Sequence, residues 1–217
     1  MKKWMSVIIL LLCAICGSCK PKENLKGVLS TSDCGPSCWL NLKPGVTTEV
    51  EARQELVVHP KQIKQESIFE YGPTEAYSNT IGFSLTNTEK ISTLFFTEGV
   101  LNLININTDK GKMKLEEGFE LFGYPDQIVF QVDRCTKQFI GQAMCLRIYL
   151  YYPQKGLILS YEYGSSSSLL IDSKQEIDKL YFFPIGYNPF NELLLSSSAK
   201  NIEWPGYTFI ENIWDSD

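Results

Sequence analysis

The feature that most constrains the fold of this chain is an internal repeat with a spacing of about 65 residues. When the sequence is shifted onto itself by this spacing, apolar residues fall on apolar residues, for example Val50 on Leu115 and Leu56 on Leu121. A Pro-x-Gln-Ile sequence also recurs, at residues 60–63 and 125–128. We interpret the pattern as two diverged copies of one unit, with chance agreement as the alternative.

Each copy begins with a predicted helix. In the first copy, Thr48 and Glu51 have the spacing of a capping box, and His59-Pro60 is expected to end the helix. A rough apolar stripe is expected from Val46, Val50, Leu56 and Val57. In the second copy an apolar stripe recurs at i, i+4 and i+7, and a glycine and a proline end the helix: Leu115, Phe119, Phe122, Gly123 and Pro125.

Short runs rich in β-branched and aromatic residues follow each helix and are typical of strands. In the first copy they are Ser67–Tyr71, Thr80–Asn87, Ile91–Thr97 and Val100–Ile106; in the second they are Gln127–Cys135, Met144–Tyr152, Leu157–Tyr163 and Ile177–Phe183. A helix turn at Pro189–Leu195 and an aromatic loop at residues 204–207 complete the chain. We therefore predict an α+β fold of two tandem related units, each a short helix followed by antiparallel strands, with the helices packed on one face of the sheet.

The N-terminus has the pattern of a secretory leader. Met1-Lys2-Lys3 precedes about thirteen mostly apolar residues, too few for a spanning helix, which needs roughly 20. The sequence Cys16-Gly17-Ser18-Cys19 resembles a bacterial lipobox, although such boxes usually carry Leu where Cys16 stands. This resemblance implies that Cys19 is diacylated and becomes the mature N-terminus. The alternative is an ordinary signal peptide cut near Gly17 or Ser18, with Cys19 unmodified.

These patterns give a domain organisation and a location. We predict a signal peptide at 1–18, a lipid-anchored tether at 19–33, a first helix-plus-sheet unit at 34–108 and a second unit with a C-terminal extension at 109–217. Two acyl chains on Cys19 would anchor the exported protein to a bacterial membrane in the cell envelope. The net charge is −5, and without Lys2 and Lys3 the remaining 18 basic and 25 acidic residues give −7, which disfavours nucleic acid as a partner. The expected partners are the membrane, through the lipid, and an envelope protein.

Four cysteines remain if Cys13 and Cys16 leave with the leader and Cys19 carries lipid. An even number in an exported domain predicts two disulfides, with three possible connectivities. We favour Cys34–Cys38, across a tight Gly-Pro loop, and Cys135–Cys145, across an expected hairpin. A zinc site on these cysteines is the alternative, disfavoured because the chain lacks CxxC spacing and a second histidine.

The sequence offers little that predicts catalysis. The only histidine, His59, precedes a proline at the expected helix end and is interpreted as a capping or surface residue. We identify neither a Gly-x-Ser-x-Gly sequence nor a phosphate-cradling glycine-rich loop. We therefore expect a non-enzymatic protein with no cofactor, no metal and no catalytic residues. The alternative is an envelope ligand-binding or hydrolytic protein that acts on glycan or peptide.

One strand predicts a binding surface. If residues 146–152 are a strand, Leu146, Ile148 and Leu150 face the helix, whereas Arg147, Tyr149 and Tyr151 share the other face. Tyrosine and arginine are the residues that most often anchor protein interfaces, so this face is a candidate binding site. The alternative is that the C-terminal segment, with Phe182, Phe183, Phe190 and Trp204, covers it as a second core.

Two resemblances to known families support this interpretation. Residues 36–52 resemble the opening of uncharacterised bacterial envelope lipoproteins, which have a Pro-Cys-Trp start, Pro-Gly-x-Thr-Thr and an acidic helix. More distantly, Pro-Gly-x-Thr-x-x-Val at 44–50 together with Leu121-Phe122-Gly123-Tyr124-Pro125-Asp126 resembles the helix-then-sheet units of the SmpA/OmlA small outer-membrane lipoproteins, which are themselves similar to the repeats of β-lactamase-inhibitory protein. The resemblances imply protein–protein contact or envelope scaffolding, with no catalytic residues to carry over.

Overall fold

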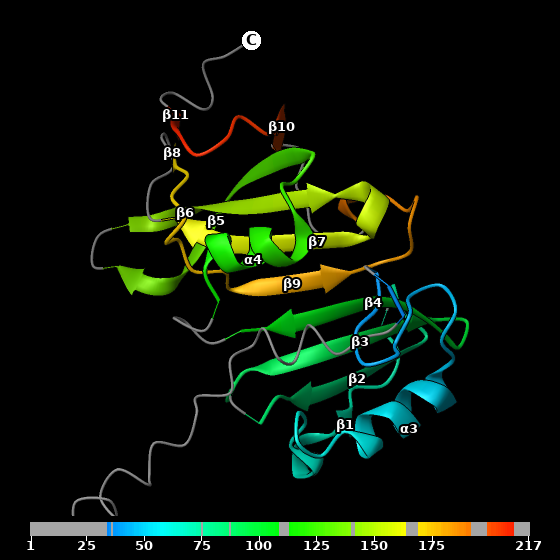
Figure 1. Ribbon diagram of the computed structural model, residues 1–217. Coiled ribbons are helices and arrows are strands. Elements are labelled where there is room, and N and C mark those ends of the chain that lie inside the picture. The colour runs from blue at the N-terminus through cyan, green and yellow to red at the C-terminus, as the bar shows by residue number, and fades with distance from the viewer. Residues whose placement is uncertain are drawn as a thin grey trace, which may run out of the picture.

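The computed structural model shows two helices lying against a large sheet (Figure 1). It describes residues 34–210, except for residues 36, 75, 87, 109–112, 140–141, 164–168 and 192–198. In chain order the described elements are α3 (Glu49–Val58), η1 (Gln65–Ser67), β1 (Phe69–Glu70), β2 (Asn79–Ser84), β3 (Ile91–Thr97), β4 (Val100–Asn107), α4 (Leu115–Phe122), β5 (Gln127–Phe139), β6 (Gln142–Tyr152), η2 (Pro153–Lys155), β7 (Leu157–Tyr163), β8 (Leu169–Leu170), β9 (Lys179–Phe182), η3 (Pro189–Asn191), β10 (Lys200–Glu203) and β11 (Phe209–Ile210).

Nine of these strands form one open antiparallel sheet, in the order β1-β2-β3-β4-β9-β7-β6-β5-β10. Strands β8 and β11 form a separate antiparallel pair. The α+β class is therefore confirmed. Each of the eight predicted strands overlaps an observed one, whereas β8, β10 and β11 have no predicted counterpart. The expected helix turn at Pro189–Leu195 corresponds to η3 in its described part.

Helix α3 begins where the capping box predicts. The Glu51 backbone N–H donates to Thr48 Oγ1, and the Thr48 N–H donates to Glu51 Oε2 at 2.8 Å. The helix ends at Val58, immediately before His59-Pro60. The expected apolar stripe is wrong except at Leu56, which is buried with Ala52, whereas three valines are exposed: Val46, Val50 and Val57. Ala52 and Leu56 are one turn apart and face the sheet, and the two-residue step from Val50 to Ala52 turns Val50 away from it.

Helix α4 packs closely on the sheet because it has a glycine at its centre. A Cβ atom at Gly118 would lie 2.9 Å from Cδ1 of both Leu159 and Ile177, so a larger residue would require the ends of these two side chains to shift. Leu115 and Phe119 are buried beside it, as the predicted stripe requires. The helix ends at Gly123, as expected, with the Gly123 N–H donating to the Phe119 carbonyl at 2.8 Å.

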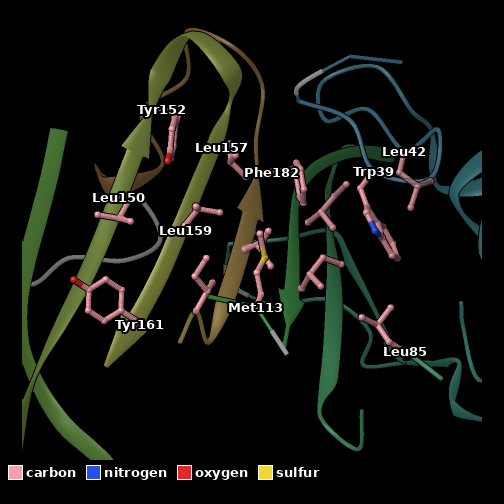
Figure 2. Close-up of a cluster of buried hydrophobic side chains, with 14 of the residues drawn as sticks. Trp39, Leu42, Leu85, Met113, Leu150, Tyr152, Leu157, Leu159, Tyr161 and Phe182 are labelled. Carbon is pink, nitrogen blue, oxygen red and sulfur yellow. The ribbon is translucent and has the colours of Figure 1, made fainter. Parts of the chain in front are cut away.

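The core lies mainly on one face of the sheet, and buried residues of both helices belong to it. Figure 2 shows part of this core. Side chains from the β1–β4 half lie on one side of β9, and side chains from the β5–β7 half lie on the other. A smaller cluster lies on the opposite face and contains no residue of α3 or α4. The two helices therefore contribute to the same core, as predicted.

Strand β9 joins the two halves of the sheet because it pairs with β4 on one side and with β7 on the other. Phe182 lies opposite Ile104 and Leu157, and Leu180 lies opposite Ile106 and Leu159. These residues belong to the main core, which is therefore continuous across the junction.

The first described residues also contact both halves of the sheet. Trp39 and Leu42 exchange two backbone hydrogen bonds around a tight turn, and the buried Trp39 ring stacks on Phe83 of β2 with centroids 5.4 Å apart. Ser37 lies against the turn at Gly156 between β6 and β7. The N-terminal segment thus contacts both the first and the second half of the sheet.

Candidate functional site

Arg147, Tyr149 and Tyr151 lie on the sheet face away from the helices, as the alternation along β6 predicts. Tyr149 and Tyr151 belong to the smaller cluster on that face, and Tyr151 lies opposite Ile158 of β7. The alternating residues of β6 belong to the main core beneath the helices: Leu146, Ile148 and Leu150.

This tyrosine face is covered by the chain that follows β9. The Tyr149 side chain is only 2 % exposed, and its ring meets the edge of Phe190 with centroids 5.9 Å apart. Tyr151 stacks on Phe183 at 5.9 Å and meets Phe190 edge-on at 4.8 Å. These contacts agree with the alternative of a second core for Phe183 and Phe190, which occupy the space that a partner would need. The other two residues expected to cover this face, Phe182 and Trp204, pack in or against the main core instead.

The charges on this face are largely paired with one another. Arg147 Nη2 donates to Glu162 Oε1 at 2.7 Å, and the two side chains are 14 % and 15 % exposed. On the adjacent strand, burial lowers the pKa of Lys179, and the positive charge of Arg147 lowers it further. Among the described residues, none forms a hydrogen bond or ion pair with the Lys179 ammonium group. Arg147 thus holds the sheet together rather than projecting toward a partner.

A group of four aromatic rings reaches the surface on the helix side of the sheet. We call Phe119, Tyr124, Trp204 and Tyr207 the aromatic cluster. Phe119 is its buried centre, with ring centroids 5.3 Å from Tyr124, 5.2 Å from Trp204 and 5.6 Å from Tyr207. Tyr124 lies nearly parallel to Trp204 at 6.0 Å, and Tyr207 is nearly perpendicular to Trp204 at 6.1 Å.

The outer rings of the cluster are open to solvent. Tyr124 is 63 % exposed and Tyr207 is 44 % exposed, and Trp204 is partly buried against the main core. The cluster therefore combines a fixed base at Phe119 with accessible outer rings. Such exposed aromatic groups on a folded surface are typical of interaction sites.

Three separate parts of the chain build the aromatic cluster. Phe119 is on α4, and Tyr124 follows the turn that ends this helix at Gly123, whose carbonyl accepts a hydrogen bond from Tyr152 Oη at 3.0 Å. Strand β10 pairs with β5 at the end of the sheet farthest from α3 (Figure 1) and brings in the residues that follow it. The backbone N–H of Trp204 donates to the backbone carbonyl of Asp126 at 3.2 Å, which continues this pairing beyond β10.

Two acidic residues lie beside Tyr207, because the Ile171 N–H donates to the Thr208 carbonyl at 2.8 Å and the Glu116 N–H donates to the Ser173 carbonyl at 3.0 Å. Burial raises the pKa of the Tyr207 hydroxyl, and the nearby groups Tyr124, Glu116 and Asp172 raise this pKa further by opposing a second negative charge. The carboxylates of Glu116 and Asp172 are therefore close enough to Tyr207 to act on it electrostatically. A ligand at this surface meets aromatic rings together with the carboxylates of Glu116 and Asp172.

The other residues singled out in the sequence lie apart from the aromatic cluster. His59 is the C-terminal capping residue of α3 and lies 3.3 Å from Glu55 Oε2, as expected for a capping or surface histidine. The Cα atoms of Cys34 and Cys38 are 5.7 Å apart, a separation that a disulfide can span. Cys19 lies outside the described residues.

The second expected disulfide falls on the hairpin of β5 and β6. Strand pairing places Cys145 opposite Asp133, two residues before Cys135 along β5. The side chains of both cysteines lie outside the described ones. Both disulfide pairings stay predictions.

Two surveys of the described part of the chain complete the description. In residues 34–210, apart from the gaps given above, no three His, Cys, Asp or Glu side chains gather as metal ligands would. Within the same residues, α3 and α4 are too short and too polar to cross a bilayer.

The aromatic cluster could be predicted only in pieces. The loop at residues 204–207 is recognisable as aromatic, and Tyr124 lies in the sequence that resembles a helix exit. Their meeting depends on the pairing of β10 with β5, and β10 is a four-residue strand with a single apolar residue, which is too little for a recognisable strand pattern. Comparison of the chain with protein-family models, with curated proteins and with solved structures finds no match.

Proposed function

We propose that this protein is a non-enzymatic binding module, anchored by lipid in a bacterial cell envelope, and that it binds a protein partner at the aromatic cluster. The observation that carries this proposal is the exposure of Tyr124 and Tyr207 around the fixed ring of Phe119. Aromatic side chains lose little conformational entropy on binding and contribute a large contact area, which is why they dominate the energy of protein interfaces.

The cluster replaces the strand face of Arg147, Tyr149 and Tyr151 as the candidate binding surface. Binding at the strand face would first require the segment with Phe183 and Phe190 to leave its place, which exposes buried aromatic area. The aromatic cluster requires no such step, because its outer rings are already accessible.

The envelope location rests on the leader and on the lipobox-like sequence before Cys19. Metabolic labelling with a palmitate analogue tests it. We expect Cys19→Ser to lose the label and to leave the membrane fraction, and Cys13→Ser, a matched change inside the leader, to keep both. Equal labelling of the two variants would refute lipidation at Cys19.

We also propose that the two halves are tandem related units. Each half is a helix followed by four strands of the main sheet in sequential order, β1 to β4 and β5, β6, β7, β9. In both helices the glutamate at the third helical position accepts from the backbone N–H of the capping residue at 2.8 Å, Glu51 from Thr48 and Glu117 from Lys114. Both capping residues also form a β-bridge to a later segment of their own half, Thr48 to Val100 and Lys114 to Glu176. These shared features support the repeat interpretation of the sequence.

Site-specific photocrosslinking in the native bacterium tests the binding function. A photoreactive phenylalanine analogue is placed at Tyr124 or Tyr207 of the full-length protein, and crosslinked proteins are identified by mass spectrometry. The matched control position is Tyr71, which is 55 % exposed and follows β1 in the other half of the sheet. We expect one protein to be crosslinked from positions 124 and 207 but not from position 71.

A second variant connects the crosslink to the rings themselves. With the photoreactive group at position 124, the additional change Tyr207→Ala is expected to weaken the crosslink severalfold, because it removes one of the exposed rings. Identical crosslinks from all three positions would refute a specific site. A crosslink to envelope glycan instead of protein would replace the proposal with the glycan-binding alternative.

A further inference from the structure

The arrangement of the outer rings favours a positively charged group of the partner. The face of an aromatic ring carries negative electrostatic potential and attracts ammonium and guanidinium groups. Tyr124 and Trp204 are inclined by only 19°, whereas Trp204 and Tyr207 are inclined by 79°. The exposed surface therefore offers ring faces in two nearly perpendicular orientations.

The charges beside the rings point the same way. Backbone hydrogen bonds place Glu116, at the start of α4, and Asp172, after β8, beside the cluster: the Ile171 N–H donates to the Thr208 carbonyl at 2.8 Å, and the Glu116 N–H donates to the Ser173 carbonyl at 3.0 Å. Lys114 lies 3.7 Å from Glu116 in an exposed ion pair, which contributes little and does not prevent a competing cation from binding. Lys155, near the end of α4, donates to the Phe122 carbonyl and is held there.

An uncharged apolar partner fits this surface less well. Such a partner would remove the carboxylate of Asp172 from water, and would leave Glu116 with only its exposed ion pair to Lys114, which is unfavourable. An anionic partner would meet the same carboxylates and the overall charge of −5. A cation is the chemistry that the rings and the carboxylates both accept.

We infer that the aromatic cluster recognises a lysine or arginine side chain in a basic segment of the partner protein. The inference rests on the binding function proposed above and adds the chemical identity of what is bound. The cationic group lies over an exposed ring of Tyr124, Trp204 or Tyr207, and Glu116 and Asp172 supply the counter-charge.

The direct test uses two short synthetic peptides of glycine and serine that differ at one central residue, arginine in one and the neutral isostere citrulline in the other. Binding to the full-length protein in detergent is followed by NMR of the tryptophan indole N–H groups. We expect saturable shifts with the arginine peptide and affinity for the citrulline peptide at least about fivefold weaker. Raising the salt from about 0.05 M to about 0.5 M should weaken the arginine peptide severalfold.

Charge variants of the protein provide the second measurement. Glu116→Gln and Asp172→Asn are each expected to weaken the arginine peptide about two- to threefold. Asn at position 172 keeps the oxygen that accepts from the Lys174 N–H at 3.0 Å, so the local turn is retained. The matched control is Glu66→Gln, because Glu66 is an exposed carboxylate in η1 that is distant in sequence from Glu116 and Asp172. This change should have no effect.

The outcomes separate this inference from the binding function. Equal binding of the two peptides, or no saturable binding of the arginine peptide, overturns the inference. A photocrosslink from position 124 that persists unchanged in the Glu116→Gln/Asp172→Asn variant overturns it as well, while leaving the binding function intact. If the photocrosslink from position 124 is unchanged by Tyr207→Ala, the binding function itself is refuted.

Discussion

Gly156 provides the sharpest test of how the turn after β6 is held. Its backbone has φ 56° and ψ 42°, in the left-handed region, and its carbonyl accepts from the Phe183 N–H at 2.9 Å. A Cβ atom at this position would lie well inside contact distance of the Phe183 carbonyl oxygen and 3.0 Å from Ser37 Cβ. A backbone oxygen cannot rotate away as a side chain can. We therefore predict that Gly156→Ala forces the turn and the end of β9 apart.

The magnitude follows from two effects. An alanine in the left-handed region costs about 1 kcal/mol or slightly more. Crowding in a packed position adds about 1–3 kcal/mol. We expect the free energy of unfolding to fall by about 3 kcal/mol in Gly156→Ala.

Gly99 is the matched control, because it also has positive φ, 77°, but a Cβ there would have no atom within 4 Å. Gly99→Ala should therefore lose only about 1 kcal/mol. Urea unfolding of both variants measures the difference. With an m value of about 2 kcal/mol/M, the midpoint of Gly156→Ala should lie about 1 M below that of Gly99→Ala. Losses that agree within about 0.5 kcal/mol would refute the reasoning, because left-handed strain alone would then account for both variants.

Three further predictions concern side chains. Phe119→Ala should lower the free energy of unfolding by about 3–5 kcal/mol and shift the tryptophan emission to longer wavelength, because Phe119 packs against Trp204; unchanged emission would contradict this. A double-mutant cycle with Arg147→Met and Glu162→Gln should give a coupling energy of about 1–3 kcal/mol, whereas additive losses would show that the pair contributes nothing. Lys179→Met should raise the stability at neutral pH, because burial lowers the pKa of Lys179. The advantage of Lys179→Met should shrink as pH rises from that lowered pKa to the ordinary lysine value, because in this range the unfolded chain keeps a proton that the folded chain has lost. Urea midpoints of the variant and the original protein that change in parallel across this range would refute the prediction.

Local features of the fold could be predicted from the sequence because they depend on neighbouring residues. The capping box of Thr48 and Glu51 depends on four consecutive residues, and both of its hydrogen bonds are present in the structure. The alternation along β6 is equally local, since it follows from the geometry of any strand. The exposed valines of α3 show the limit, because a two-and-a-half-turn helix can bury either of its apolar sides and the sheet decides which.

The candidate site depends on contacts that no local pattern encodes. The four rings of the aromatic cluster meet only because β10 pairs with β5, although Gln127 and Glu203 are far apart in the chain. The covering of Tyr149 and Tyr151 has the same origin, because the alternation shows which side chains share a face but not what lies over them. A segment of loops with Phe183 and Phe190 covers this face, and loops leave no periodic trace in a sequence.

The position of β9 has a consequence for the order in which the chain can fold. This strand is among the last parts of the sheet to be synthesised, yet it lies between β4 and β7 in the middle. Until residues 179–182 arrive, the emerging chain exposes two unpaired strand edges, one at β4 and one at β7, and both present apolar side chains. Such edges are sites of aggregation, and closing them requires contacts between residues distant in sequence, which slows folding. A shortened chain that ends before residue 179 should therefore accumulate as aggregates even though most of its strands are present.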